Sequence, residues 1–75
     1  MADFFYTLLV PNYLKRNFMV REFASWEELH NAWLNEDQGQ MVVGWSENGK
    51  IEERFPTTDK DGQWYIWYKN VKIVL

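Results

Sequence analysis

Short apolar runs separated by polar turns make up most of this chain. The first run covers residues 4–10 and stops at Pro11-Asn12, and the second covers residues 17–23. Pro-Asn is a turn dipeptide, and runs of this length that are rich in aromatic and β-branched residues are typical of strands. The pattern therefore predicts a hairpin with a long loop.

A second hairpin is predicted around Asn48-Gly49. The runs on either side, residues 41–45 and 50–55, are rich in apolar residues. Asn-Gly between two such runs is the strongest short-range signal for a hairpin, because both residues accept the positive φ that a tight turn requires.

Residues 25–39 carry the signals of one amphipathic helix. Ser25 and Glu28 form a capping box, and Gly39 is placed for the C-cap. Apolar residues recur at spacings of three and four, which is the helical period. This apolar stripe consists of Trp26, Leu29 and Trp33.

The predicted order of elements is β-β-α-β-β-β. A chain of 75 residues is too short to hold two hydrophobic cores, so we expect a single domain over residues 1–75. No cysteine is present, and packing must therefore supply the stability. We predict an α+β fold in which one helix packs on a mainly antiparallel sheet of four to five strands. A β-grasp-like topology is compatible with this order.

The last extended stretch contains four aromatic rings in the sequence QWYIWYK, residues 63–69. We expect Asn70 to bend this strand and residues 71–75 to continue it. Side chains alternate across a strand. One face would carry Trp64, Ile66 and Tyr68. The other would carry Tyr65, Trp67, Val71, Ile73 and Leu75. We expect the second set to enter the core, which leaves Trp64 and Tyr68 on a sheet face that the helix does not cover.

An uncovered face with Trp64 and Tyr68 has three interpretations. Loops fold over it, or the rings simply lie partly exposed, as apolar atoms often do. Another protein or a second copy of this chain covers it, since Trp and Tyr are enriched in interface hot spots. Single-stranded nucleic acid stacks its bases on it.

The net negative charge of the chain comes from the predicted helix. The formal net charge is −3, and the helix carries acids without Lys or Arg. These acids are Glu27, Glu28, Glu36 and Asp37. Glu36 and Asp37 fall in the last turn, where the helix dipole disfavours anions, so their replacement by Lys should raise stability. They are either a solvated surface or a docking site for a basic protein partner. The overall negative charge opposes nucleic-acid binding, which needs cations.

The sequence offers no recognisable catalytic or metal-binding set. His30 is the only histidine, and it borders the helix stripe without a serine or cysteine partner in a recognisable pattern. Residues 59–62 (DKDG) resemble a fragment of an EF-hand loop, but Thr57 stands at the first ligand position and Tyr68 where a bidentate Glu is needed. We interpret these residues as a turn, and we predict no enzyme activity, no cofactor and no metal.

We therefore expect a non-enzymatic protein-interaction module, a small adaptor or inhibitor. It would bind a protein partner or itself through Trp64, Tyr68 and neighbouring rings, with Glu36 and Asp37 on a second surface. The alternative is single-stranded nucleic-acid binding on the same aromatic face. A small acidic chain of this kind would suit a phage or mobile-element protein that blocks a host factor.

We expect a cytoplasmic location without membrane association. The first apolar run is too short to span a membrane, and it lacks a positive region before it and a cleavage site after it. Neither cysteine nor an Asn-x-Ser/Thr acceptor occurs in the chain, so nothing favours an oxidising or glycosylating compartment.

Overall fold

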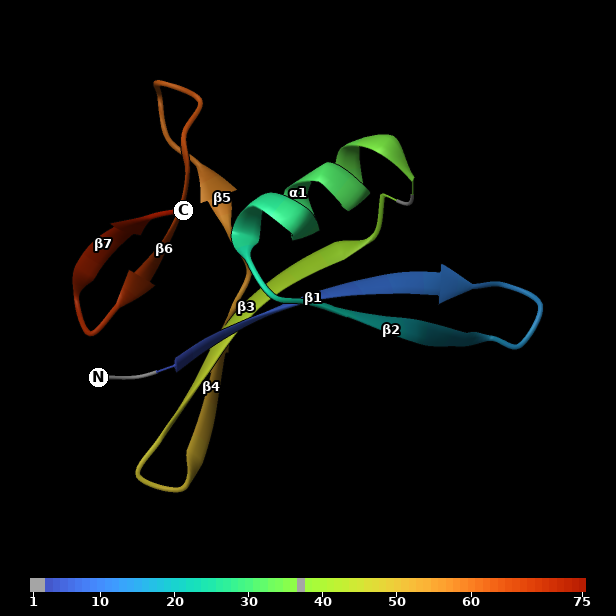
Figure 1. Cartoon of the computed structure of the whole chain (residues 1–75), viewed down its shortest axis with the longest axis horizontal. Coiled ribbons are helices and arrows are strands. Elements are labelled where there is room, and N and C mark those ends of the chain that lie inside the picture. Colours follow the sequence, from blue (N-terminus) through green and yellow to red (C-terminus); the bar gives the residue numbers. More distant parts are fainter. Residues whose placement is uncertain (1–2, 37) are drawn as a thin grey trace.

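The computed structural model describes residues 3–36 and 38–75, and these residues form one helix and two antiparallel sheets (Figure 1). The larger sheet has the strand order β2-β1-β3-β4, and the smaller sheet has the order β5-β6-β7. The elements are β1 (Asp3–Asn12), β2 (Asn17–Phe23), α1 (Trp26–Asn35), β3 (Gln40–Glu47), β4 (Lys50–Arg54), β5 (Thr57–Thr58), β6 (Trp64–Tyr68) and β7 (Val71–Val74). The predicted α+β class is confirmed.

The sheets differ in detail from the sequence expectation. The described residues form seven strands in two sheets, where the sequence predicted four to five strands in one sheet. Every pair of neighbouring strands in the described residues is antiparallel, including the central pair of β1 and β3. A β-grasp sheet has a parallel central pair, so the chain does not form that topology.

Both predicted hairpins of the larger sheet are present. Residues 13–16 form the loop between β1 and β2. Asn48 and Gly49 join β3 to β4, with φ angles of 53° and 77°. Positive φ at both central residues matches the right-handed twist of the flanking strands. Local turn chemistry is thus sufficient to predict the second reversal. The expectation that the first strand stops at Pro11-Asn12 is wrong, because both residues belong to β1 and pair with Phe18 and Asn17 of β2.

The helix α1 begins at the predicted capping box. The Ser25 Oγ accepts a hydrogen bond from the backbone N–H of Glu28 at 3.2 Å. The Glu28 carboxylate accepts one from the backbone N–H of Ala24 at 3.1 Å. Two N–H groups at the helix start are therefore satisfied by side chains. The Glu28 bond goes to Ala24, the residue before the N-cap, whereas a standard capping box uses the N–H of the N-cap residue itself.

The helix ends earlier than the sequence indicated. Glu36 occupies the C-cap, and its N–H donates to the carbonyl oxygen of Ala32. Gly39 lies beyond this point and has a different role. A Cβ at Gly39 would overlap the backbone carbonyl of Leu9, so glycine lets the chain that leads into β3 pass close to β1.

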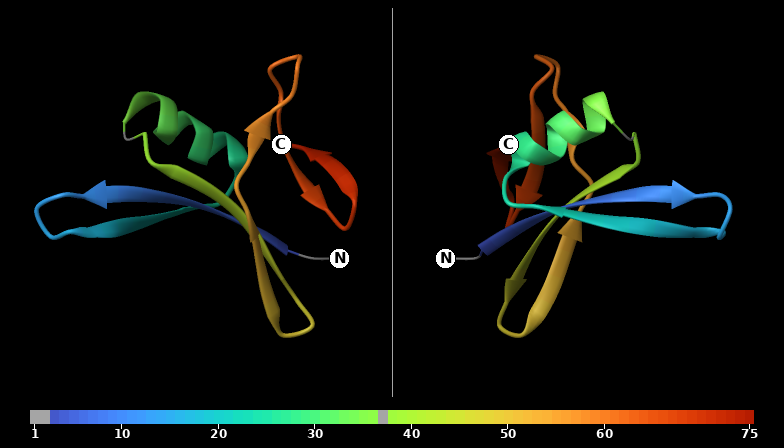
Figure 2. Two further views of the ribbon diagram at one scale, coloured as in Figure 1. Left: turned by 180° about the vertical axis from the view of Figure 1, so that it is seen from behind. Right: turned by 45° about the vertical axis from the view of Figure 1, so that its right-hand side comes forward.

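The helix and the smaller sheet cover one face of the larger sheet (Figure 1), and both lie on this side in the views of Figure 2. The buried cluster under the helix contains Leu8, Leu29, Ala32 and Met41. The buried cluster under the smaller sheet contains Val43, Trp45 and Ile66. Tyr6 and Trp26 pack against both clusters, so the two covering elements share one continuous core.

The last aromatic stretch forms a hairpin and not one bent strand. Lys69 and Asn70 have positive φ, 49° and 64°, and the chain reverses there so that β7 pairs with β6. In this register Ile66 lies opposite Ile73, which places even-numbered residues of β6 and odd-numbered residues of β7 on one face. The prediction that the odd-numbered residues of β6 enter the core is therefore wrong: Ile66 is buried and Trp67 is exposed.

Candidate protein-interaction surface

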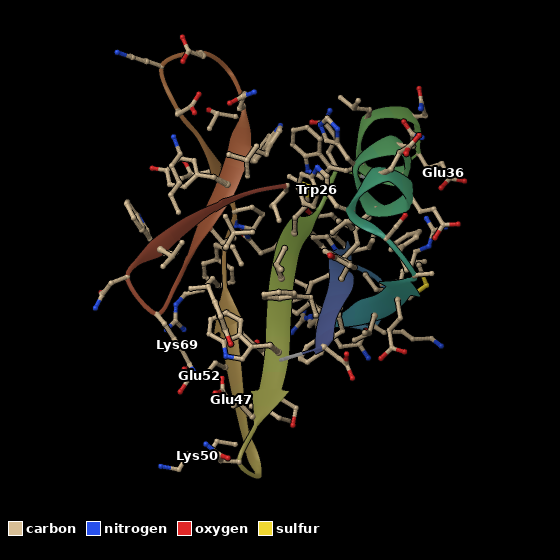
Figure 3. All side chains as sticks on the ribbon, turned by 60° about the vertical axis from the view of Figure 1, so that its left-hand side comes forward. Trp26, Glu36, Glu47, Lys50, Glu52 and Lys69 are labelled. Atoms are coloured by element: carbon tan, nitrogen blue, oxygen red, sulfur yellow. The ribbon has the colours of Figure 1, made fainter. Side chains whose placement is uncertain are left out.

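Trp64, which was expected on an uncovered face, lies between β6 and α1. Its ring centroid is 5.9 Å from that of Trp26, 5.6 Å from that of Trp33 and 5.8 Å from that of His30. Figure 3 shows Trp26 between the helix and the smaller sheet. Trp64 is therefore a half-buried part of the core, because the hairpin turn directs even-numbered residues of β6 towards the helix.

Tyr68 packs in the same way at the other end of β6. Its ring centroid lies 5.4 Å from that of Phe4 and 5.0 Å from that of Trp45, and its hydroxyl donates to a carboxylate oxygen of Glu47 at 3.2 Å. The expected placement of Trp64 and Tyr68 on an uncovered face is thus wrong. Their contact with a partner stays a prediction, limited to the exposed edges of the two rings.

An uncovered apolar face does exist, on the side of the larger sheet that points away from α1. We call it the far face, and it consists of Phe5, Leu9, Phe18, Val20 and Ile51 around the buried Val42, with Glu22 and Glu53 on its edge strands. A hollow of about 280 Å³ lies on this face between Phe5, Leu9 and Val20. Phe18 and Ile51 are 61% and 66% exposed. Such a patch on a small protein is typical of a contact surface.

The distal part of the β1–β2 hairpin extends this apolar surface. We call residues 10–20 the hairpin arm, and Figure 1 shows that it projects beyond the helix. Tyr13 and Leu14 at its tip are 87% and 98% exposed. Lys15 and Arg16 stand beside them in the loop. The arm therefore offers aromatic, aliphatic and basic groups to a neighbouring molecule.

A second aromatic surface lies on the outer face of the smaller sheet. The rings of Tyr65 and Trp67 meet edge to face, with centroids 5.9 Å apart. The Lys72 Nζ lies 4.6 Å from the centroid of Tyr65, and Lys72 is the cross-strand neighbour of Trp67. This surface thus combines one exposed ring, Trp67, and one partly buried ring, Tyr65, with a cation.

The acids of the helix border a groove between α1 and β2. The groove has a volume of about 570 Å³, and Glu22, Glu28 and Glu36 are among its lining residues. Arg21 Nη1 donates to the Glu36 carboxylate at 3.1 Å, and Figure 3 shows Glu36 on the outer side of the helix. Asp37, the other expected docking acid, lies outside the described residues. Arg21 offsets the unfavourable position of Glu36 at the negative end of the helix dipole.

A charged cleft of about 370 Å³ lies between the turns of the β3–β4 and β6–β7 hairpins. Figure 3 shows Glu47, Lys50, Glu52 and Lys69 around it. Glu47 forms an ion pair and a hydrogen bond with Lys69, which lowers the pKa of the Glu47 carboxyl and raises the pKa of the Lys69 ammonium. Acids and bases alternate in this cleft, so it has no field of one sign that would attract a charged ligand.

The turn that the sequence placed at residues 59–62 is organised by Asp59. Its carboxylate accepts hydrogen bonds from Lys72 Nζ at 2.8 Å and from the backbone N–H groups of Asp61 and Gln63 at 2.9 and 3.0 Å. These contacts, that with Lys72 above all, lower the pKa of Asp59. Asp59 thus ties the β5–β6 loop to β7, which is a structural role.

The far face was missed by the sequence analysis, although a signal for it was present. Residues 4–10 are apolar on both alternating sets of positions: Tyr6 and Leu8 enter the core, while Phe5 and Leu9 point to the other side. A strand that is apolar on both faces has two faces to cover. The helix and the smaller sheet cover one of them.

Among the described residues, no group of three or more His, Cys, Asp or Glu side chains is arranged to hold a metal ion. No helix within residues 3–36 and 38–75 is both long and apolar enough to cross a membrane. Comparison with known proteins found no matching family model, no matching curated protein and no matching solved structure. We therefore infer the function of this chain from the surfaces described above.

Proposed function

We propose that this chain is a non-enzymatic protein-interaction module, a small adaptor or inhibitor, and that it binds a protein partner through the far face. One observation carries this proposal. Phe5, Leu9, Val20 and Ile51 form an apolar surface that neither the helix nor the smaller sheet covers. Exposed apolar patches with a polar rim are typical of protein contact sites.

The acidic side chains around the far face indicate the charge that a complementary partner surface would carry. Glu22 and Glu53 stand on its two edge strands, and Glu36 lines the groove beyond Glu22. An apolar centre with an acidic rim is complementary to an apolar patch that is ringed by Lys or Arg. This is the same class of basic partner that the acidic helix indicates.

The proposal is tested with charged substitutions on matched exposed residues. Ile51→Lys disrupts the far face, and Trp67→Lys places the same charge on the outer face of the smaller sheet. Both residues are more than half exposed, so both variants should keep the fold. A partner captured by the wild-type chain must bind the purified protein saturably, lose at least ~10-fold in affinity with Ile51→Lys and keep its affinity with Trp67→Lys.

The opposite pattern, with binding lost in Trp67→Lys and retained in Ile51→Lys, would show that the partner binds the smaller sheet. Equal affinity of both variants would show that neither surface binds the partner. Circular dichroism of each variant establishes beforehand that the fold is retained.

Single-stranded nucleic-acid binding is the second candidate function, on a different surface from the far face. It is favoured by the exposed ring of Trp67 beside the partly buried ring of Tyr65, together with Lys72, which also pairs with Asp59, because base stacking needs rings and phosphate needs cations. A labelled single strand at low salt tests it. A shift that Trp67→Ala abolishes supports this function, and no shift excludes it for the strand used.

We further infer a cytoplasmic location without membrane association. The absence of cysteine and of glycosylation acceptors from the sequence supports it. Expression as a fusion with a fluorescent protein, followed by fractionation, distinguishes this location from a membrane or exported one. A small chain that acts only by binding is also consistent with an inhibitor encoded by a phage or a mobile element.

A further inference from the structure

The four edge strands of the two sheets are protected to very different degrees. Edge strands carry unpaired N–H and C=O groups, and proteins protect them with charged side chains or by keeping them short. Four of the five residues of β4 are charged, β5 has two residues, and β7 carries Lys72 among four. The edge strand β2 has seven residues, NFMVREF, and four of them are apolar. It is the least protected edge in the described part of the chain.

The apolar residues of β2 are exposed on both faces of the sheet. Phe18 and Val20 belong to the far face, while Met19 points to the helix side. All three are exposed, Met19 by 49% and the other two by more than half, because they lie in the hairpin arm, which projects beyond the helix (Figure 1). A strand added at residues 18–20 of this edge would meet apolar side chains on both of its faces.

We propose that β2 pairs antiparallel with β2 of a second copy of this chain, with the two-fold axis at Met19. The two larger sheets then form one continuous sheet of eight strands. This inference does not depend on the identity of the partner that the far face binds. It concerns the backbone edge of β2, whereas the proposed function concerns the side chains of the far face.

The sequence of β2 selects this register. A symmetric antiparallel pair must place a residue and its own copy at the axis, so that opposed side chains share a face. With Met19 at the axis, Phe18 lies opposite Val20 of the second copy. In the same register Arg16, the last loop residue before β2, comes next to Glu22 of the second copy, and each of these pairs occurs twice.

The neighbouring registers are less favourable. With Val20 at the axis, Phe18 would face the carboxylate of Glu22. With Arg21 at the axis, two guanidinium groups would face each other, and like charges directly opposite are destabilising. The Met19 register pairs apolar side chains with each other and opposite charges with each other.

This pairing closes after two copies. A two-fold interface uses the same edge of both copies, and the outer edges that remain are the two β4 strands. Their charged residues oppose further pairing. Because two short strands bury less area than a standard stable interface, we expect a reversible equilibrium between monomer and dimer.

The test compares two Lys variants by light scattering over a dilution series. Met19→Lys opposes two ammonium groups at the axis, and we expect it to raise the dimer dissociation constant at least ~10-fold. Ile51→Lys is the control, because Ile51 is exposed on β4, the opposite edge of the sheet. It should leave the dimer unchanged. A wild-type chain that stays monomeric up to its solubility limit overturns the inference.

Two further measurements report on the edge itself. Alternate amides of β2 should exchange more slowly with deuterium at high protein concentration than at low concentration, while those of β4 should not change. The chain has no cysteine, so Met19→Cys introduces a single thiol that should cross-link two copies on mild oxidation. An Ile51→Cys variant should stay uncross-linked. A dimer without concentration-dependent protection in β2 would place the interface elsewhere and overturn the inference.

The same variants separate this inference from the proposed function. Met19 lies on the helix side of β2 and outside the far face, so Met19→Lys should dissolve the dimer and keep binding of a far-face partner. Ile51→Lys should keep the dimer and weaken binding of a far-face partner. Loss of partner binding in Ile51→Lys with no dimer in any variant would support the proposed function and overturn the dimer.

Discussion

The ring of Phe5 in β1 lies over Gly44 in β3, at the position that the Cβ of any other residue would occupy. The two residues are cross-strand neighbours on the far face. Glycine at this point of a strand therefore makes room for a ring, as the interior of a sheet often requires.

Replacement of Gly44 by Ala should destabilise the protein. The added methyl group would overlap atoms Cε2 and Cζ of Phe5, and overpacking of this kind costs about 1–3 kcal/mol. Urea unfolding monitored by tryptophan fluorescence measures the change. Ser46→Ala, at an exposed position of the same strand, is the control and should change the free energy of unfolding by less than about 0.5 kcal/mol. Equal effects of the two variants would contradict the packing seen here.

Trp64 and Trp67 should respond very differently to truncation. Trp64 packs against the rings of Trp26 and Trp33, and removal of a packed aromatic side chain costs about 3–5 kcal/mol. Trp67 is 54% exposed, so Trp67→Ala should cost about 1 kcal/mol or less. Thermal unfolding of the two variants in parallel tests this assignment of faces. A larger loss of stability in Trp67→Ala than in Trp64→Ala would show that Trp67, and not Trp64, faces the core.

The protein should lose stability in acid through Asp59. The hydrogen bonds from Lys72, Gln63 and Asp61 lower the pKa of Asp59 in the folded state below its value in the unfolded chain. Stabilisation by this group is thus complete above the unfolded pKa and is lost as the pH falls through the folded pKa.

An Asp59→Asn variant tests this pH dependence. It should be less stable than the wild type at neutral pH, and the difference should shrink as the pH falls below about 4, where the carboxyl of the unfolded chain takes up its proton. The measurement is chemical unfolding at several pH values. A difference that stays constant over this range would exclude Asp59 as a source of acid sensitivity.

Glu36→Lys should be close to neutral for stability, in contrast to the expectation from the helix dipole alone. Lys at the helix end gains up to about 1 kcal/mol from the dipole. The variant loses the exposed ion pair with Arg21, worth about 0–1 kcal/mol, and places two cations together. A rise in the free energy of unfolding by more than about 1 kcal/mol would show that the contact with Arg21 does not stabilise the fold.

Features that depend on neighbouring residues can be predicted from this sequence. The turn at Asn48-Gly49 and the cap formed by Ser25 and Glu28 are decided within four residues of chain, and both are present in the structure. Composition and element order are likewise sufficient for the α+β class.

The faces of the strands cannot be predicted in the same way. Lys69-Asn70 is compatible with a bend or with a reversal, and the two outcomes direct Trp64 to opposite sides of the sheet. Which side of β1 the helix covers depends on contacts between distant residues, such as Leu8 with Leu29. The surface that we propose for partner binding is therefore the far face, because the strand pairing places Trp64 and Tyr68 against the core.

The short link between the two sheets gives the fold a modular character. Phe55 and Pro56 connect β4 to β5, and the segment after them supplies Trp64 and Ile66, which complete the two parts of the core. A chain cut at this link would yield two fragments, neither of which can close the core alone. We expect the two fragments to reassemble into the folded domain. At concentrations too low for the fragments to find each other, fusion to two interacting proteins should bring them together, so that refolding would report on the interaction.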